Sequence, residues 1–265
     1  MPFARVNGIN LHYRCSGNGE PLILVAGWGT DSRTWVFQLP VFRKYFQVIT
    51  FDNRGVGRSD KPHGPYSMLQ MAEDVIGLMD CLHIGAASVL GLSMGGMIAQ
   101  EAAINYPERV LRLVLGCTFA GRRDGGGPTQ DYVRHAGEDV RQLRVTLASL
   151  ATNNPMTRLF VVTVARLLSG CGIEGFQSQG AAIRDHDTTD RLHLIRCPTL
   201  VVAGTRDRVI RPESSELIAS RLPQGRLFLI ENGSHSISSE NRREFNQVVL
   251  RFLLDEAEEL NALSA

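Results

Sequence analysis

The sequence lacks an excess of charge of either sign. Its 265 residues contain 28 lysines and arginines against 27 aspartates and glutamates, so the formal net charge is +1. A chain this close to neutrality has no long-range field that would gather nucleic acid or an anionic membrane surface. We therefore expect neither a nucleic-acid partner nor a membrane partner.

The cysteine spacing of a disulfide framework or a zinc site is also missing. The 5 cysteines are an odd number, and no two of them form a Cys-x-x-Cys pair. The longest apolar run, near 159–168, is too short to span a bilayer and contains Arg166. The first residues, MPFARVNG, are typical of a strand and a turn and not of a signal peptide. We therefore expect a cytoplasmic protein with reduced thiols.

The composition is that of a globular protein, with 43% hydrophobic and 21% charged residues. In two parts of the chain, predicted strands alternate with predicted helices, which favours a parallel sheet covered by helices on both faces. An Asn-Gly turn at 7–8 predicts a hairpin before them. The strands are expected at 22–26, 46–51, 86–90, 110–115, 199–203 and 227–230, and the helices at 68–82, 94–105, 213–222 and 242–260. One further helix, carrying Trp35, Leu39 and Phe42, is expected to begin at Asp31 or Ser32.

The alternation stops between Thr118 and Ile195. That segment contains no clear buried strand, is broken by GGGP at 125–128, and continues with what resembles several short helices. We therefore assign 1–118 and 196–265 to an α/β core, and 119–195 to a small helical insertion.

The pattern Gly-x-Ser-x-Gly at 91–95 places Ser93 on a sharp turn between a predicted strand and a predicted helix. Glycines suit this turn, because a side chain two residues before or after the serine would collide with the neighbouring strand or helix. The free N–H groups and positive dipole end of the helix suit a developing oxyanion. This context predicts that Ser93 is a nucleophile.

A serine nucleophile needs a base, which is generally a histidine oriented by a carboxylate. Asp207 follows the predicted strand 199–203, and His235 follows the strand 227–230. Carboxyl ends of parallel strands meet at one edge of a sheet, where Ser93 is also expected. The sequence thus predicts a catalytic triad of Ser93, His235 and Asp207. The other histidines fit less well, since they lie in the hairpin, a proline-rich loop, a helix end or the middle segment: His12, His63, His83, His135, His186 and His193.

Two other positions for the acid are less suitable. The strand 110–115 is followed by Cys117 and by no carboxylate, and Asp52 precedes the serine in a loop typical of a structural turn. An oxyanion hole requires two backbone donors. We expect them to be the N–H groups of Met94 and of Trp28, although the indole of Trp28 can also simply pack under the middle segment.

Together these residues resemble the α/β-hydrolase superfamily. The resemblance covers nearly the whole chain, most weakly 121–187, and rests on Gly27 with Trp35, FDNRGVGRS at 51–59, GLSMGG at 91–96, Asp207 and His235. It implies an α/β fold with a doubly wound, mostly parallel eight-stranded sheet, in which 119–195 is a helical cap over the site. It implies no cofactor and no metal.

Details of the motifs narrow the resemblance. Many members have His-Gly where this chain has Ala26-Gly27. In those members the histidine supports the oxyanion loop without taking part in the chemistry, so the resemblance implies a loop that is adjusted here but still functional. Ser93 argues against haloalkane dehalogenases and epoxide hydrolases, which use aspartate there. The elbow and the short cap look like those of bacterial enol-lactone hydrolases and small carboxylesterases. The segment GWGTDS at 27–32 also looks like the oxyanion loop of signalling hydrolases, such as strigolactone and karrikin receptors and a bacterial stress regulator.

The expected function is cleavage of a carboxylic ester or lactone of a small acyl substrate through an acyl-enzyme. Two alternatives stay open: a carbon–carbon bond hydrolase of diketones, and a slow-turnover signalling hydrolase that binds a ligand. The cap is expected to set specificity, and the sequence does not indicate the oligomeric state. Candidates for binding a substrate carboxylate, each also typical of a solvated surface, are Arg122, Arg123, Arg134 and Arg166, and candidates for an apolar pocket or the core are Met94, Met97 and Met156.

Overall fold

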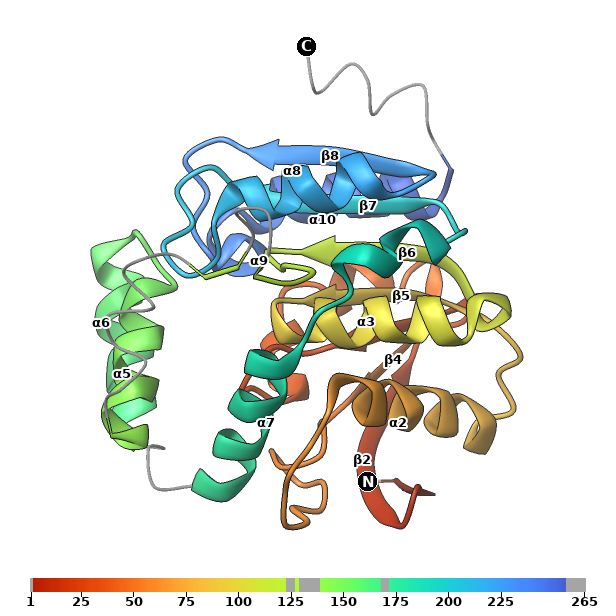
Figure 1. The fold of residues 1–265 in the computed structure, drawn as a ribbon, viewed down its shortest axis with the longest axis horizontal. Helices are drawn as coiled ribbons and strands as arrows, with labels where there is room; N and C mark the ends of the chain where they lie inside the picture. Colours follow the sequence, from red (N-terminus) through yellow and green to blue (C-terminus); the bar gives the residue numbers. More distant parts are fainter. Residues whose placement is uncertain (1, 123–126, 129–138, 168–171, 256–265) are drawn as a thin grey trace.

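One sheet forms the central layer of the molecule (Figure 1). A computed structural model describes residues 2–122, 127–128, 139–167 and 172–255, and its eight strands follow the order β1-β2-β4-β3-β5-β6-β7-β8. The pairs β1–β2 and β2–β4 are antiparallel, and the other pairs are parallel, as the sequence predicts. The strands are β1 (Phe3–Val6), β2 (Ile9–Ser16), β3 (Glu20–Val25), β4 (Phe46–Phe51), β5 (Ala87–Leu92), β6 (Val110–Gly116), β7 (Thr199–Gly204) and β8 (Gly225–Ile230).

Helices cover both faces of the sheet, and each set buries its own hydrophobic cluster. One cluster joins the sheet to α2 (Met68–Cys81), α3 (Met94–Asn105) and α8 (Pro212–Arg221). The other joins it to α1 (Leu39–Phe42) and α10 (Arg242–Leu253). Short elements complete the core, namely the 3-10 helices η1 (Ser32–Trp35) and η2 (Pro107–Arg109) and the helix α9 (Ile237–Glu240).

Strand β3 illustrates why the central strands are apolar at every position. Its residues Leu22 and Leu24 belong to the cluster beneath α1 and α10, whereas Ile23 and Val25 belong to the cluster beneath α2 and α3. All four are fully buried. Successive side chains point to opposite faces, so a strand covered on both sides must be hydrophobic throughout.

The first hairpin has the predicted two-residue turn. Val6 pairs with Ile9, and the two residues between them, Asn7 and Gly8, have φ angles of 47° and 82°. Positive φ at both central positions defines a type I′ turn, which asparagine and glycine tolerate.

The segment after β3 differs from the prediction of a single helix. The structure has η1, capped by the Asp31 side chain, and then the separate short helix α1, with Pro40 in its first turn. Proline has no N–H group to donate within a helix, so it starts a new helix and does not continue the previous one. Trp35 and Phe42 are nevertheless both buried in one hydrophobic cluster.

The interval that the sequence assigns to the cap contains helices and no long strand among its described residues. They are α5 (Val140–Leu150), α6 (Pro155–Leu167), α7 (Ile173–Asp185) and the 3-10 helix η3 (Thr189–Leu194). In Figure 1, α5 and α6 lie on the side toward which the arrows of β6 and β8 point. Near the C-terminus, α10 ends at Leu253, short of the predicted 260; residues 256–260 lie outside the described part. Within the described part, no helix has the length and apolar character needed to cross a bilayer.

Candidate active site

Ser93 lies on the turn between β5 and α3 in an unusual backbone conformation, with φ 54° and ψ −118°. Positive φ is costly for a residue with a side chain, on the order of 1–3 kcal/mol. Neighbouring contacts hold it there: the Ser93 N–H donates to the Gly116 carbonyl at 2.8 Å, and the Thr118 hydroxyl donates to the Ser93 carbonyl at 2.8 Å. Both partners come from the end of β6 and the loop after it, so the adjacent strand fixes the turn.

The glycines of the motif are required by close approach. A Cβ atom at Gly91 would collide with the Gly95 carbonyl of α3, and one at Gly95 would collide with the Val25 carbonyl of β3. At these two positions β5 approaches α3, and α3 approaches β3, so closely that a side chain would not fit. This is the reason expected from the sequence for glycine at both positions.

The structure brings the three predicted triad residues together at the carboxyl ends of their strands. His235, in the loop after β8, has its Nε2 atom 3.1 Å from the Ser93 Oγ atom. Its Nδ1 atom lies 2.7 Å from Oδ2 of Asp207, in the loop after β7. The imidazole thus has one nitrogen directed at the hydroxyl and the other at a carboxylate, which is the geometry of an activated serine.

Asp207 is held by its second oxygen as well. Its Oδ1 atom accepts hydrogen bonds from the backbone N–H groups of Val209 and Ile210, at 2.7 and 3.0 Å. The carboxylate is buried, with 7% of the residue exposed. The two backbone N–H groups and the His235 ring together hold both carboxylate oxygens. The carboxylate therefore has one orientation, which fixes its plane relative to the imidazole.

The two predicted oxyanion donors belong to the helix that follows Ser93 and to a loop that approaches it. Met94 is the first residue of α3, where the helix has N–H groups without intrahelical acceptors. The loop after β3 approaches from the other side, since a Cβ at Gly27 would lie 3.5 Å from the Ser93 Cβ. In that loop the Gly29 N–H donates to Gln179 Oε1 and the Thr30 N–H to the Gly27 carbonyl. Among the described contacts, the N–H of Trp28 has no acceptor.

The indole of Trp28 packs against α7, a helix of the predicted cap. Its ring stacks on Phe176 with centroids 4.2 Å apart and planes 13° apart. Its Nε1 atom donates to the Phe176 carbonyl at 2.8 Å. The side chain of Trp28 therefore packs under the middle segment, and this packing does not use its backbone N–H, so the expected oxyanion role of that N–H stays a prediction.

The other described histidines are not bonded to Ser93. His12 is buried against Asp52, with 3.1 Å between Nδ1 and Oδ2, and Asp52 also accepts the N–H groups of Ser32 and Arg58. Asp52 thus organises a turn, as its loop indicated. His63 is exposed and pairs with Glu174 on α7, and His135 lies outside the described residues. His186 is buried with no hydrogen bond among the described residues, and burial lowers its pKa to about 4.

The residues considered from the sequence for substrate binding lie in different environments. Met94 and Met97 are buried core residues of α3, whereas Met156 on α6 is 81% exposed. Arg122 is exposed. Arg123 and Arg134 lie outside the described residues, and Arg166 lies on α6 with its side chain outside the described part.

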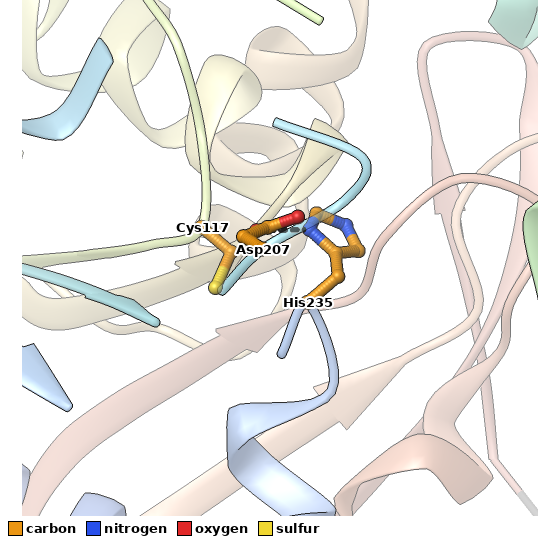
Figure 2. A group of neighbouring side chains, drawn as sticks. All are labelled: Cys117, Asp207 and His235. Atoms are coloured by element: carbon orange, nitrogen blue, oxygen red, sulfur yellow. Dashed lines mark hydrogen bonds and ion pairs between the residues drawn. The ribbon is translucent and has the colours of Figure 1, made fainter. Parts of the chain in front are cut away.

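Cys117 was not assigned a role from the sequence, and the structure places it beside the triad (Figure 2). One potential ligand atom from each of Cys117, Asp207 and His235 lies within 4.8 Å of the others. Burial raises the pKa of the Cys117 thiol well above its usual range, and the charge of Asp207 raises it further. Metals bind the thiolate, and the histidine nitrogen nearest Asp207 is already bonded to it. The group therefore suits a neutral thiol packed behind a triad better than a metal centre.

Sequence reasoning also missed the contact of α7 with the loop after β3. The Gly29–Gln179 hydrogen bond joins residues 150 positions apart, and no local pattern marks such a pairing. Gln179 lies in the segment where the family resemblance is weakest, so the motifs gave no signal for it.

Comparison with known proteins finds relatives that share the fold described above. The family model described as alpha/beta hydrolase fold matches residues 20–170. A 3-oxoadipate enol-lactonase of Acinetobacter baylyi is 30% identical, over 91% of this chain and 92% of its own length.

Two solved structures extend the similarity to nearly the full chain. The enol-lactonase from Burkholderia xenovorans LB400 superposes with a TM-score of 0.84 at 31% identity, covering 96% of this chain and 100% of that one. A meta-cleavage product hydrolase (CumD) from Pseudomonas fluorescens IP01 has a TM-score of 0.83 at 26% identity, covering 97% of this chain and 98% of that one.

Proposed function

Because the chain belongs to the α/β-hydrolase fold family, we propose that it is a serine hydrolase that cleaves a carboxylic ester or lactone of a small acyl substrate. The observation that carries the proposal is the continuous path from Ser93 Oγ through His235 to the Asp207 carboxylate, with separations of 3.1 and 2.7 Å. Hydroxyl, imidazole and carboxylate in this order provide a nucleophile, a general base and a group that orients the base.

In the proposed reaction, Ser93 Oγ attacks the substrate carbonyl while His235 Nε2 takes the hydroxyl proton. Asp207 holds the imidazole in the tautomer that leaves Nε2 free and stabilises the imidazolium that forms. The imidazolium then gives its proton to the leaving alkoxide, and the acyl group remains on Ser93. A water molecule, deprotonated by His235, releases the acid and restores the serine.

The oxyanion of each tetrahedral intermediate is bound by the N–H groups of Met94 and Trp28. Two donors that are fixed before the reaction stabilise the developing charge without reorganisation, and removing one donor generally costs about 10²–10³ in kcat. This chemistry uses side chains and backbone groups of the chain itself and requires neither a metal nor a cofactor.

A lactone or ester as the scissile group is supported by the two enol-lactonases, each of which matches more than nine-tenths of this chain. The third compared protein, a meta-cleavage product hydrolase, supports carbon–carbon bond hydrolysis as a second candidate. A lactone yields one product and an ester yields two, whereas a vinylogous diketone loses its chromophore on cleavage. These readouts separate the candidates in one screen.

The test is a turnover screen of the purified protein over short-chain esters, small lactones and a vinylogous diketone. The parent is compared with Ser93→Ala and with Ser220→Ala, a control that removes an exposed hydroxyl of α8. We expect multiple turnovers on esters or lactones, a loss of at least about 10³-fold in Ser93→Ala, and parent-like rates in the control. Equal rates in Ser93→Ala and the parent would overturn the proposal. Turnover that stops after a single acylation event would instead favour the signalling alternative.

A further inference from the structure

Gln179 on α7 is a buried side chain that joins two loops on the core. Its Oε1 atom accepts the Gly29 N–H at 3.0 Å, and its Nε2 atom donates to the Arg54 carbonyl at 2.8 Å. The residue is fully buried. Only one orientation of the amide satisfies both contacts, since the reversed amide would set donor against donor and acceptor against acceptor.

The helix around Gln179 is fixed on both of these loops. On one side a Cβ at Gly180 would lie 2.6 Å from the Trp28 ring, and Phe176 stacks on that ring. On the other side a Cβ at Gly175 would lie 2.6 Å from the Gly55 Cα. A helix packed this closely has little freedom to slide, so it provides a rigid support for the Gln179 amide.

The contact to Gly29 decides which peptide groups of the loop stay available. Gly29 has a φ of 66°, and a tight turn closes around it through the Thr30 N–H and the Gly27 carbonyl at 3.3 Å. The bond from Gly29 to Gln179 fixes the peptide between Trp28 and Gly29, and the bond from Thr30 to the Gly27 carbonyl fixes the peptide that contains the Trp28 N–H. Within the loop, the Thr30 hydroxyl also donates to the Gly27 carbonyl at 2.9 Å, and Gln179 adds a support that comes from outside the loop.

We infer that Gln179 is a positioning residue that holds the Trp28 peptide in the orientation of an oxyanion donor, so that the cap helix α7 forms part of the support of the oxyanion hole. The inference rests on the proposed serine-hydrolase function. It predicts a role in the transition state and little role in substrate binding, because the oxyanion is present only when the carbonyl has been attacked.

The test uses Gln179→Met, which keeps the size of the side chain and removes both hydrogen bonds. The matched control is Gln177→Met, the same substitution at an exposed position of the same helix. We expect kcat of Gln179→Met to fall by roughly 10–100-fold, with KM within about threefold of the parent, since a misplaced donor affects the chemical step. The affinity for a trifluoromethyl ketone, which forms an anionic adduct with the serine, should fall by a similar factor.

A third variant, Gln179→Glu, separates positioning from packing. Burial favours the neutral acid at this position, and in that form one oxygen accepts the Gly29 N–H while the O–H donates to the Arg54 carbonyl. We therefore expect this variant to recover much of the kcat lost in Gln179→Met. Equal rates in the two variants, or a rise in KM with unchanged kcat, would overturn the inference. Circular dichroism and thermal unfolding establish that each variant is folded before its rates are compared.

If Gln179→Met does not fold, amide hydrogen exchange of the parent provides an independent test. The Gly29 amide should be protected from exchange, whereas an amide of an unsupported exposed loop exchanges freely; free exchange at Gly29 would overturn the inference. The two proposals fail differently. Loss of activity in Ser93→Ala combined with parent-like activity and ketone affinity in Gln179→Met would remove the positioning role and leave the proposed function intact.

Discussion

Replacement of Asp207 by asparagine is predicted to reverse the tautomer of His235. The backbone N–H groups of Val209 and Ile210 donate to Asp207 Oδ1, and of the two polar atoms of an asparagine side chain only the carbonyl oxygen can accept them. The asparagine carbonyl must therefore take that place, which leaves its NH2 group where Oδ2 lies 2.7 Å from His235 Nδ1. An NH2 group donates to Nδ1, so the imidazole proton moves to Nε2, where it faces the serine.

A histidine protonated at Nε2 cannot take the Ser93 proton. We therefore expect kcat/KM of Asp207→Asn to fall by about 10⁴-fold, which corresponds to about 5 kcal/mol of transition-state stabilisation. The assay is steady-state hydrolysis of the best ester or lactone from the screen, measured from pH 6 to pH 9, with unfolding curves to show that the variant is folded. The matched control is Asp80→Asn, which changes an exposed carboxylate paired with Arg109 and should leave the rate within about twofold, because exposed pairs contribute little. A folded Asp207→Asn variant with more than a tenth of the parent rate would refute this reasoning.

Three further predictions concern the packing that supports the site. Gly95→Ala should lose most activity and about 1–3 kcal/mol of unfolding free energy, because the new Cβ atom would be forced against the Val25 carbonyl. A variant with the hydrolysis rate and the urea midpoint of the parent would contradict this prediction. Arg54→Met should lower the unfolding free energy, measured in urea, by about 3–5 kcal/mol, because it leaves the Asp74 carboxylate buried without its partner at 2.6 Å. The double variant Arg54→Met with Asp74→Leu should lose less unfolding free energy, because no unpaired charge remains. An equal loss in the single and the double variant would contradict this explanation. For His186, burial lowers the pKa from 6.5 to about 4, so the unfolded chain binds the proton first as the pH falls. The unfolding free energy should thus drop by up to about 3 kcal/mol between pH 6.5 and pH 4, and His186→Leu should remove this part of the pH dependence; an identical pH dependence in the variant would contradict it.

The core of the fold was predictable because its signals are local. The run that forms β3 is apolar on both faces, Gly91 is required by its contact with Gly95 four residues later, and α3 begins at Met94 and ends at Asn105 as predicted. The meeting of Asp207 and His235 with Ser93 was also predictable, because the carboxyl ends of parallel strands share one edge of the sheet. The catalytic role of these three residues stays a prediction until the experiments above are done.

The surroundings of the site could not be predicted in the same way. The sequence analysis assigned no role to Cys117. Its position near Asp207 depends on the pairing of β6 with β7, which no local pattern around Cys117 indicates. The support of Gly29 by Gln179 depends on how the cap helix packs on the core, and hydrophobic periodicity contains no information on that packing. Pro40 was the one local signal that the sequence analysis overlooked, and it divides the expected helix into η1 and α1.

The central claim is tested most directly by labelling the protein with a fluorophosphonate and locating the adduct by peptide mass spectrometry. We expect one adduct per chain, on Ser93, formed in parallel with the loss of hydrolytic activity and formed far more slowly in His235→Ala. An adduct on another residue that accompanies inactivation, or full turnover by a protein whose Ser93 is completely modified, would contradict the account.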